Sequence, residues 1–125
     1  MTTPIVLLVD DNEGNRDLME LHLEGLPVRC MTASDGQGAL KSVAQSRPDL
    51  ILLDVMMPKM SGFEVCRAIK SDESLREIPV VMVTALDSVV DQDRAKSEGA
   101  DGYMVKPIDR EGLRDEVCSR LKLDA

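Results

Sequence analysis

The stretch DLILLDVMMP, residues 49–58, decides the fold of this chain. Four apolar residues at 50–53 are followed directly by Asp54, and the residues at 55–58 are again apolar. A run this apolar is typical of a strand that is buried on both faces, as in a parallel sheet. Because a lone buried carboxylate is costly, we expect Asp54 to lie at the end of a core strand, at the mouth of a site where a cation neutralises it.

Short apolar segments recur along the chain and alternate with segments whose apolar residues have helical spacing. The predicted strands are 5–9, 28–32, 49–54, 80–83 and 103–105. The predicted helices are 16–24, a segment around 39–44, a segment around 63–69, 88–98 and 109–121. Strands that alternate with helices in this way predict an α/β fold, a doubly wound (βα)5 parallel sheet of five strands with helices on both faces.

Length and composition predict one ordinary globular domain. The chain has 125 residues, of which 43% are hydrophobic and 30% charged, and we expect 1–125 to form a single domain. The net charge of −8 argues against direct nucleic-acid binding, which needs a basic face. No apolar run approaches the roughly 20 residues of a membrane span. The three cysteines, Cys30, Cys66 and Cys118, are far apart and predict reduced thiols in a cytoplasmic protein.

Polar side chains follow four of the predicted strands. Asp10 and Asp11 follow the first strand, and Asp54 follows the third. Thr84 ends the fourth strand, and Lys106 follows the fifth. The carboxyl ends of parallel strands meet at one edge of the sheet, where ligands bind. Three carboxylates in one place need a cation, and an all-oxygen set of ligands suits Mg²⁺. With Mg²⁺ and the lysine the formal charge sums to zero.

Four motifs occur in order: VDDN at 9–12, LLDVMMPKMSG at 52–62, VVMVTAL at 80–86 and GADGYMVKP at 99–107. On these motifs the chain resembles, over essentially its whole length, the CheY-like receiver domains of two-component response regulators. The resemblance implies the flavodoxin-like strand order 2-1-3-4-5. It also implies a single receiver domain over 1–125, with no output domain in this chain. Such a domain is a regulatory binding module and not an enzyme, although it catalyses its own phosphorylation and dephosphorylation.

The resemblance implies a role for each residue at the predicted edge. Asp54 is the phospho-acceptor, which takes a phosphoryl group from a histidine kinase or a histidine phosphotransfer protein. Asp10, Asp11, Asp54 and the backbone carbonyl of Met56 are the Mg²⁺ ligands, and Mn²⁺ is expected to substitute. Lys106 pairs with the phosphoryl oxygens and compensates their charge.

The resemblance also implies how the signal leaves the site. Thr84 turns its hydroxyl to a phosphoryl oxygen, and Tyr103 changes rotamer into the space that is vacated. The Lys106–Pro107 peptide is expected to be cis. The receiving surface is formed by 87–98, 103–105 and 109–121. It would contact a downstream protein or a tethered output domain, or a second copy of an otherwise monomeric chain after phosphorylation.

Two positions depart from the usual pattern of this family. Met56 lies two residues after Asp54, and Leu86 lies two residues after Thr84. In the family these positions flank the phosphoryl group and are often polar. Apolar side chains cannot orient an attacking water by hydrogen bonding, so we predict slow loss of phosphate.

The last predicted helix carries two further features. Gly112 within it costs about 1 kcal/mol relative to alanine, so we expect this helix to be loose. Arg110 and Arg114 are four residues apart and are expected to face solvent.

Alternative functions differ in the residues that they require. A Mg²⁺-dependent phosphohydrolase of the haloacid-dehalogenase kind would use Asp54 as nucleophile, but it places a second aspartate where this chain has Met56. A flavodoxin-like cofactor module would want a loop rich in Gly, Ser or Thr after the first strand, whereas 10–15 reads DDNEGN. The sequence has no GxxxxGK[ST] motif, which excludes a P-loop GTPase. A phosphate-independent adaptor with the same fold stays open.

Overall fold

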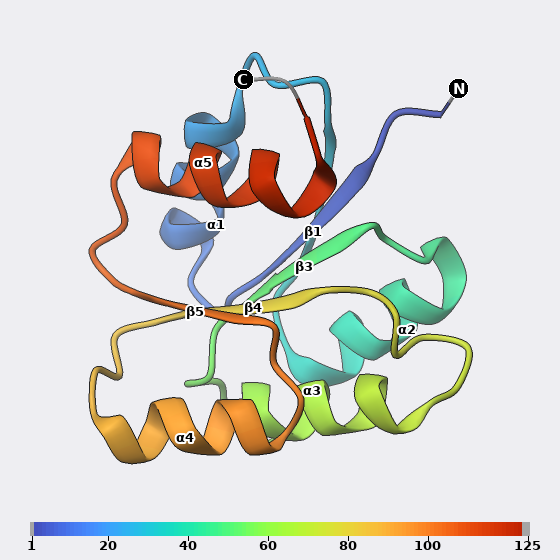
Figure 1. The fold of residues 1–125 in the computed structure, drawn as a ribbon, viewed down its shortest axis with the longest axis vertical. Coiled ribbons are helices and arrows are strands. Elements are labelled where there is room, and N and C mark those ends of the chain that lie inside the picture. Colours follow the sequence, from blue (N-terminus) through green and yellow to red (C-terminus); the bar gives the residue numbers. More distant parts are fainter. Residues whose placement is uncertain (1, 124–125) are drawn as a thin grey trace.

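The structure is a computed structural model, and it describes residues 2–123. Within this range five strands alternate with five helices (Figure 1). In chain order the elements are β1 (Ile5–Val9), α1 (Glu13–Leu23), β2 (Arg29–Ala33), α2 (Gly36–Ser46), β3 (Leu50–Leu53), α3 (Gly62–Ser71), β4 (Val80–Thr84), α4 (Val89–Ser97), β5 (Gly102–Val105) and α5 (Arg110–Leu121).

All five strands are parallel and form one sheet in the order β2-β1-β3-β4-β5. The predicted fold class and strand order are therefore confirmed. The strand order reverses at β1, whose two neighbours β2 and β3 lead away in opposite directions. Val9 pairs with Leu53, so the residues that follow β1 and β3 emerge next to each other. This is the switch point at which open α/β sheets bind ligands.

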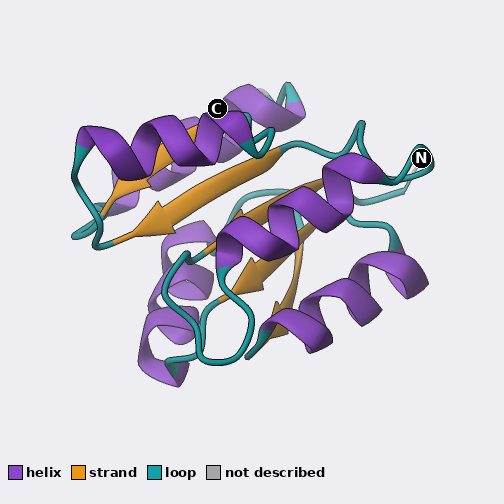
Figure 2. Ribbon diagram, turned by 90° about the horizontal axis from the view of Figure 1, so that it is seen from below, coloured by secondary structure: helices purple, strands orange, loops and turns teal. Residues whose placement is uncertain are grey.

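Helices cover both faces of the sheet. Helices α1 and α5 lie on one face, and α2, α3 and α4 lie on the other (Figures 1 and 2). Strand side chains alternate between two apolar clusters: Val6 and Leu8 belong to the cluster with α1 and α5, whereas Leu7 and Val9 belong to the other. All residues of β3 are fully buried, because side chains on both faces of this central strand meet helices.

Each helix is directly preceded by a residue whose side chain accepts a hydrogen bond from the first turn, which satisfies a backbone N–H that has no partner within the helix. These N-cap residues are Asn12, Asp35, Ser61, Ser88 and Asp109. The cap at Asn12 explains why α1 begins at Glu13, three residues before the predicted start. Gly99, which has a φ of +96°, ends α4 as a left-handed residue.

One expectation for α5, that Arg114 faces solvent, was wrong, whereas the looseness expected from Gly112 stays a prediction. Gly112 lies in the first turn, where its N–H donates to the Asp109 cap at 2.7 Å, and a Cβ would lie 2.7 Å from that oxygen. The glycine therefore lies at the capped end of α5 and not in its middle. Arg114 is half-buried, and its Nη1 donates to the carbonyls of Glu24 at 2.7 Å and His22 at 3.1 Å. It ties α5 to the C-terminal end of α1, while Arg110 is exposed as expected.

The thiols of Cys30, Cys66 and Cys118 are free, and the last two are buried. Burial raises the pKa of the Cys66 thiol to about 11, which keeps it protonated. Among residues 2–123, no helix has both the length and the apolar character needed to cross a membrane.

Candidate functional site

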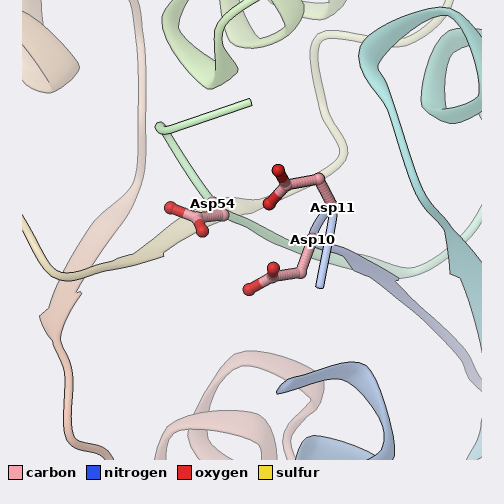
Figure 3. A group of neighbouring side chains, drawn as sticks. All are labelled: Asp10, Asp11 and Asp54. Atoms are coloured by element: carbon pink, nitrogen blue, oxygen red, sulfur yellow. The ribbon is translucent and has the colours of Figure 1, made fainter. Parts of the chain in front are cut away.

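Three carboxylates meet at the carboxyl ends of β1 and β3 (Figure 3). Asp10 and Asp11 directly follow β1, and Asp54 directly follows β3. One oxygen from each carboxylate lies within 4.8 Å of the others. Asp10 and Asp54 are buried, with 0% and 6% of their surface exposed, whereas Asp11 is exposed. The register of β1 against β3 produces this arrangement, as the sequence predicts.

Lys106 forms ion pairs with both buried carboxylates and offsets one of their two negative charges. Its Nζ lies 2.8 Å from Asp10 Oδ2 and 3.2 Å from Asp54 Oδ2. Burial disfavours the ammonium, but the hydrogen bond to Asp10 and the charges of Asp54 and Asp10 outweigh it, so the pKa of Lys106 is raised above its ordinary 10.5. The lysine therefore stays charged at neutral pH. The peptide between Lys106 and Pro107 is cis, as predicted.

The remaining oxygens of the buried carboxylates accept backbone hydrogen bonds. Asp10 Oδ1 accepts from the Asn12 N–H at 2.9 Å, and Asp54 Oδ1 accepts from the Met56 N–H at 3.1 Å. Within residues 2–123 the Asp11 side chain makes no hydrogen bond or ion pair. The site thus has two carboxylates in fixed orientations and a third that is free to bind.

The residues at this site fit a divalent metal ion. All candidate ligands are oxygens, which hard cations such as Mg²⁺ prefer. Three carboxylates and one ammonium carry a formal charge of −2, which a divalent cation balances. Asp11 presents its carboxylate to solvent, where a hydrated ion can reach it.

Thr84 and Tyr103 lie beside the site and share a contact with one loop residue. Thr84 is fully buried, and its Oγ1 accepts from the Leu86 N–H at 3.4 Å. Tyr103 donates its hydroxyl to the Leu86 carbonyl at 2.8 Å. Burial, followed by the nearby charges of Asp91, Asp54 and Asp87, raises the pKa of the Tyr103 hydroxyl. Among the described residues, no hydrogen bond joins Thr84 or Tyr103 to the carboxylates.

Two residues at the site were missed by sequence reasoning. Arg16 donates from Nη1 to the main-chain carbonyl of Asp10 at 2.6 Å. Gly62 donates its N–H to the Val55 carbonyl at 2.9 Å, and a Cβ on it would lie 2.3 Å from the Asp54 carbonyl oxygen. The glycine was visible at the end of the motif at 52–62. The arginine carried no such signal, because an arginine near a helix start is usually solvated.

Comparisons with known proteins agree with this geometry. The family described as "Response regulator receiver domain" matches residues 6–118. Response regulator PleD of Caulobacter vibrioides is 48% identical over 104 residues, which cover 83% of this chain and 23% of PleD. The alkaline phosphatase synthesis transcriptional regulatory protein PhoP of Bacillus subtilis is 40% identical over 117 residues, which cover 94% of this chain and 46% of PhoP. The chain thus spans less than half the length of these relatives.

Solved structures give the same result. The chemotaxis protein CheY4 of Vibrio cholerae matches with a TM-score of 0.87 and 33% identity, covering 94% of this chain and 98% of CheY4. The BeF3-activated DrrB receiver domain matches with a TM-score of 0.87 and 28% identity, covering 97% and 99% of the two chains. With its acidic pocket and Lys106, this chain is a phospho-accepting signalling switch, a regulatory module and not a conventional enzyme. The chain belongs to the CheY-like receiver domains of two-component response regulators.

Proposed function

We propose that Asp54 accepts the phosphoryl group, with Mg²⁺ held by Asp10, Asp11, Asp54 and the backbone carbonyl of Met56. The observation that carries this proposal is the convergence of three carboxylate oxygens within 4.8 Å, beside an ammonium 3.2 Å from Asp54. Mn²⁺ has the same preference for oxygen ligands and is expected to substitute. Asp11 is the ligand that an arriving ion meets first, because it is exposed.

In the proposed reaction, an oxygen of Asp54 attacks the phosphorus of a phosphohistidine. A bond forms between this oxygen and phosphorus, and the bond to the imidazole nitrogen breaks, which leaves an aspartyl phosphate. The bound metal would supply positive charge to the phosphoryl oxygens. The hydrogen bond from the Met56 N–H to Oδ1 orients Asp54, and Lys106 compensates the charge that the phosphoryl group brings.

The proposed relay passes through Leu86. Phosphorylation draws the Thr84 hydroxyl to a phosphoryl oxygen, which ends its contact with the Leu86 N–H. The loop before α4 then shifts, and the Tyr103 hydroxyl loses its partner at the Leu86 carbonyl. Phosphate can change the population of two states only through contacts made in one of them, and the Thr84 and Lys106 contacts supply this difference. The change reaches the face formed by α4, β5 and α5.

Further parts of the proposal concern partners and context. A two-component receiver implies a histidine kinase as its donor, directly or through a histidine phosphotransfer protein. The α4-β5-α5 face would contact a downstream protein or a tethered output domain, or a second copy of the chain after phosphorylation, and the unphosphorylated chain would be a monomer. The net charge of −8 opposes direct contact with nucleic acid. We propose one receiver domain over 1–125 and a cytoplasmic location.

Intact mass tests the acceptor. The chain is incubated with acetyl phosphate and Mg²⁺, beside the variant Asp54→Asn and a reaction with a chelator. We expect one added phosphoryl group, absent in D54N and in the chelated reaction. Asp115→Asn, which changes an exposed aspartate on α5, is the matched control and should gain the group normally. A phosphoryl group retained on D54N would contradict the assignment.

A further inference from the structure

Arg16 holds the main chain at the point where β1 ends. This half-buried arginine lies on α1, and its Nη1 donates to the Asp10 carbonyl at 2.6 Å. Its guanidinium forms no ion pair with any carboxylate among residues 2–123. The hydrogen bond to the Asp10 carbonyl is therefore the one polar contact of the Arg16 side chain in the described structure.

The Asp10 carbonyl has no donor from the sheet. The Asp10 N–H donates to Ala33 at 3.2 Å, and the Val9 carbonyl accepts from the Asp54 N–H at 2.9 Å. No strand N–H reaches the Asp10 carbonyl among the described residues, because the pairing of β1 ends at Val9. Arg16 satisfies this acceptor in place of the missing strand donor.

The same peptide group joins the two carboxylates that follow β1. The Asp10 side chain is fully buried and already oriented by Asn12 and Lys106, but Asp11 has no such contacts. The direction of the Asp11 side chain therefore depends on the orientation of the peptide between residues 10 and 11. The hydrogen bond from Arg16 restrains that peptide.

We propose that Arg16 is a positioning residue for the cation site, which acts by holding the Asp10 carbonyl so that the carboxylates of Asp10 and Asp11 face the metal together. This inference rests on the proposed function of the site. Groups that orient metal ligands typically change metal affinity by about 10- to 100-fold when they are removed.

Two effects of Arg16, that of its charge and that of its hydrogen bond, predict opposite changes in Mg²⁺ affinity when the residue is replaced. A positive charge close to a cation site repels the cation, so removing that charge alone would strengthen Mg²⁺ binding. Loss of an orienting hydrogen bond would weaken binding. The sign of the change in affinity therefore separates the two roles.

The experiment measures the dissociation constant for Mg²⁺ alone, by NMR titration of the Asp11 and Asn12 amides at constant ionic strength. Arg16→Met and Arg16→Leu remove both the charge and the donors, and Arg16→Lys keeps the charge and a donor group. Arg114→Met is the matched control, because Arg114 also donates from Nη1 to main-chain carbonyls, but at the other end of α1. Urea unfolding without metal monitors the stability of each variant.

We expect R16M and R16L to bind Mg²⁺ about 10-fold or more weakly, R16K to lie between them and the unchanged chain, and R114M to bind normally. Two neutral variants are used so that one remains if the other fails to unfold cooperatively in urea. Unchanged or tighter binding in R16M and R16L would overturn the proposal. An equal loss of Mg²⁺ affinity in R114M would also overturn it. The same holds if R16K binds Mg²⁺ no more tightly than R16M. If the unchanged chain itself binds no Mg²⁺, the proposed cation site fails, and not the role of Arg16 alone.

Discussion

At the scale of single residues, the buried Asp54 is tolerated because Lys106 neutralises it. The carboxylate is 6% exposed, and its two oxygens are taken by the Met56 N–H and by Lys106 Nζ. The same ammonium pairs with the fully buried Asp10. One lysine is thus shared by two carboxylates, and its loss would leave both without an ion-pair partner.

Replacement of Lys106 by methionine should destabilise the metal-free chain and change how its stability depends on pH. Removing one partner of a fully buried ion pair costs roughly 3–5 kcal/mol, and we expect somewhat less because Lys106 is partly exposed. The pKa of Lys106 is raised on folding, so its contribution is fully present below pH 10.5 and is lost as the pH rises through the folded-state pKa.

Urea unfolding between pH 8 and pH 11 checks this expectation, by the usual linkage between pKa and stability. The gap in the free energy of unfolding between the unchanged chain and K106M should narrow at the alkaline end. The exposed Lys96 provides the control, because Lys96→Met removes a lysine that has no ion pair in the described structure. A gap that stays constant with pH would refute the linkage.

We predict that the residues beside the acceptor influence how long the phosphoryl group stays on Asp54. Met56 is 55% exposed next to Asp54 and offers only an apolar side chain to an approaching water. Met56→Asn should therefore shorten the lifetime of the aspartyl phosphate, because an amide can orient that water by hydrogen bonding. Loss of the added mass with time after removal of acetyl phosphate measures this, and an unchanged lifetime would count against the prediction.

At the scale of elements, the acceptor loop is packed against the start of α3. Ser61 caps this helix, and the Gly62 N–H donates back to the Val55 carbonyl at 2.9 Å. The helix start and the peptide after Asp54 are so close that there is no room for a side chain at position 62. The position of Asp54 thus depends on an element that follows it in the chain.

Gly62→Ala should displace this loop. Its Cβ would lie 2.3 Å from the Asp54 carbonyl oxygen and 2.8 Å from Val55 Cα, and both are backbone atoms that cannot move aside cheaply. Overpacking of this kind costs roughly 1–3 kcal/mol. We expect a lower urea midpoint and slower gain of the phosphoryl group from acetyl phosphate. A stability and a rate equal to those of the unchanged chain would contradict the packing argument.

At the scale of the whole molecule, α4 is the helix least embedded in the core. Ala95 is its one buried residue, and Val89 and Val90 are 70% and 76% exposed. Side-chain contacts hold it to α3: Arg94 lies over the Phe63 ring at 4.4 Å, and Arg67 pairs with Glu98 at 2.7 Å. Elements with few buried apolar contacts open and shift most readily. This makes α4 the natural element to respond to the site.

Thr84→Ala should separate phosphorylation from its effect on the α4-β5-α5 face. Asp54, Lys106 and the proposed metal ligands are unchanged, so the added mass should still appear. Without the Thr84 hydroxyl, the difference in amide hydrogen exchange between phosphorylated and unphosphorylated protein should disappear from α4 and β5. Persistence of that difference in T84A would argue against a relay through Thr84.

The sequence by itself determined the α/β class, the five strands and the edge at which Asp10, Asp11, Asp54 and Lys106 meet. It could do so because these features follow from local periodicity and from the rule that parallel strands end at one edge. Element boundaries moved by a few residues where a cap decides them, as at Asn12. The resemblance to a family added the strand order and the residue roles, and the strand order is confirmed.

Only the tertiary structure decided the contacts made between distant segments. It showed that Arg16 donates to the Asp10 carbonyl and that Arg114 donates to carbonyls at the end of α1. It also showed that Thr84 accepts from the Leu86 N–H and that Tyr103 donates to the Leu86 carbonyl. Sequence spacing can assign a residue to one side of a helix or strand, but a long side chain finds its partner only when packing brings another segment within reach. The same holds for Gly62, whose need to be glycine comes from a backbone that packs against it.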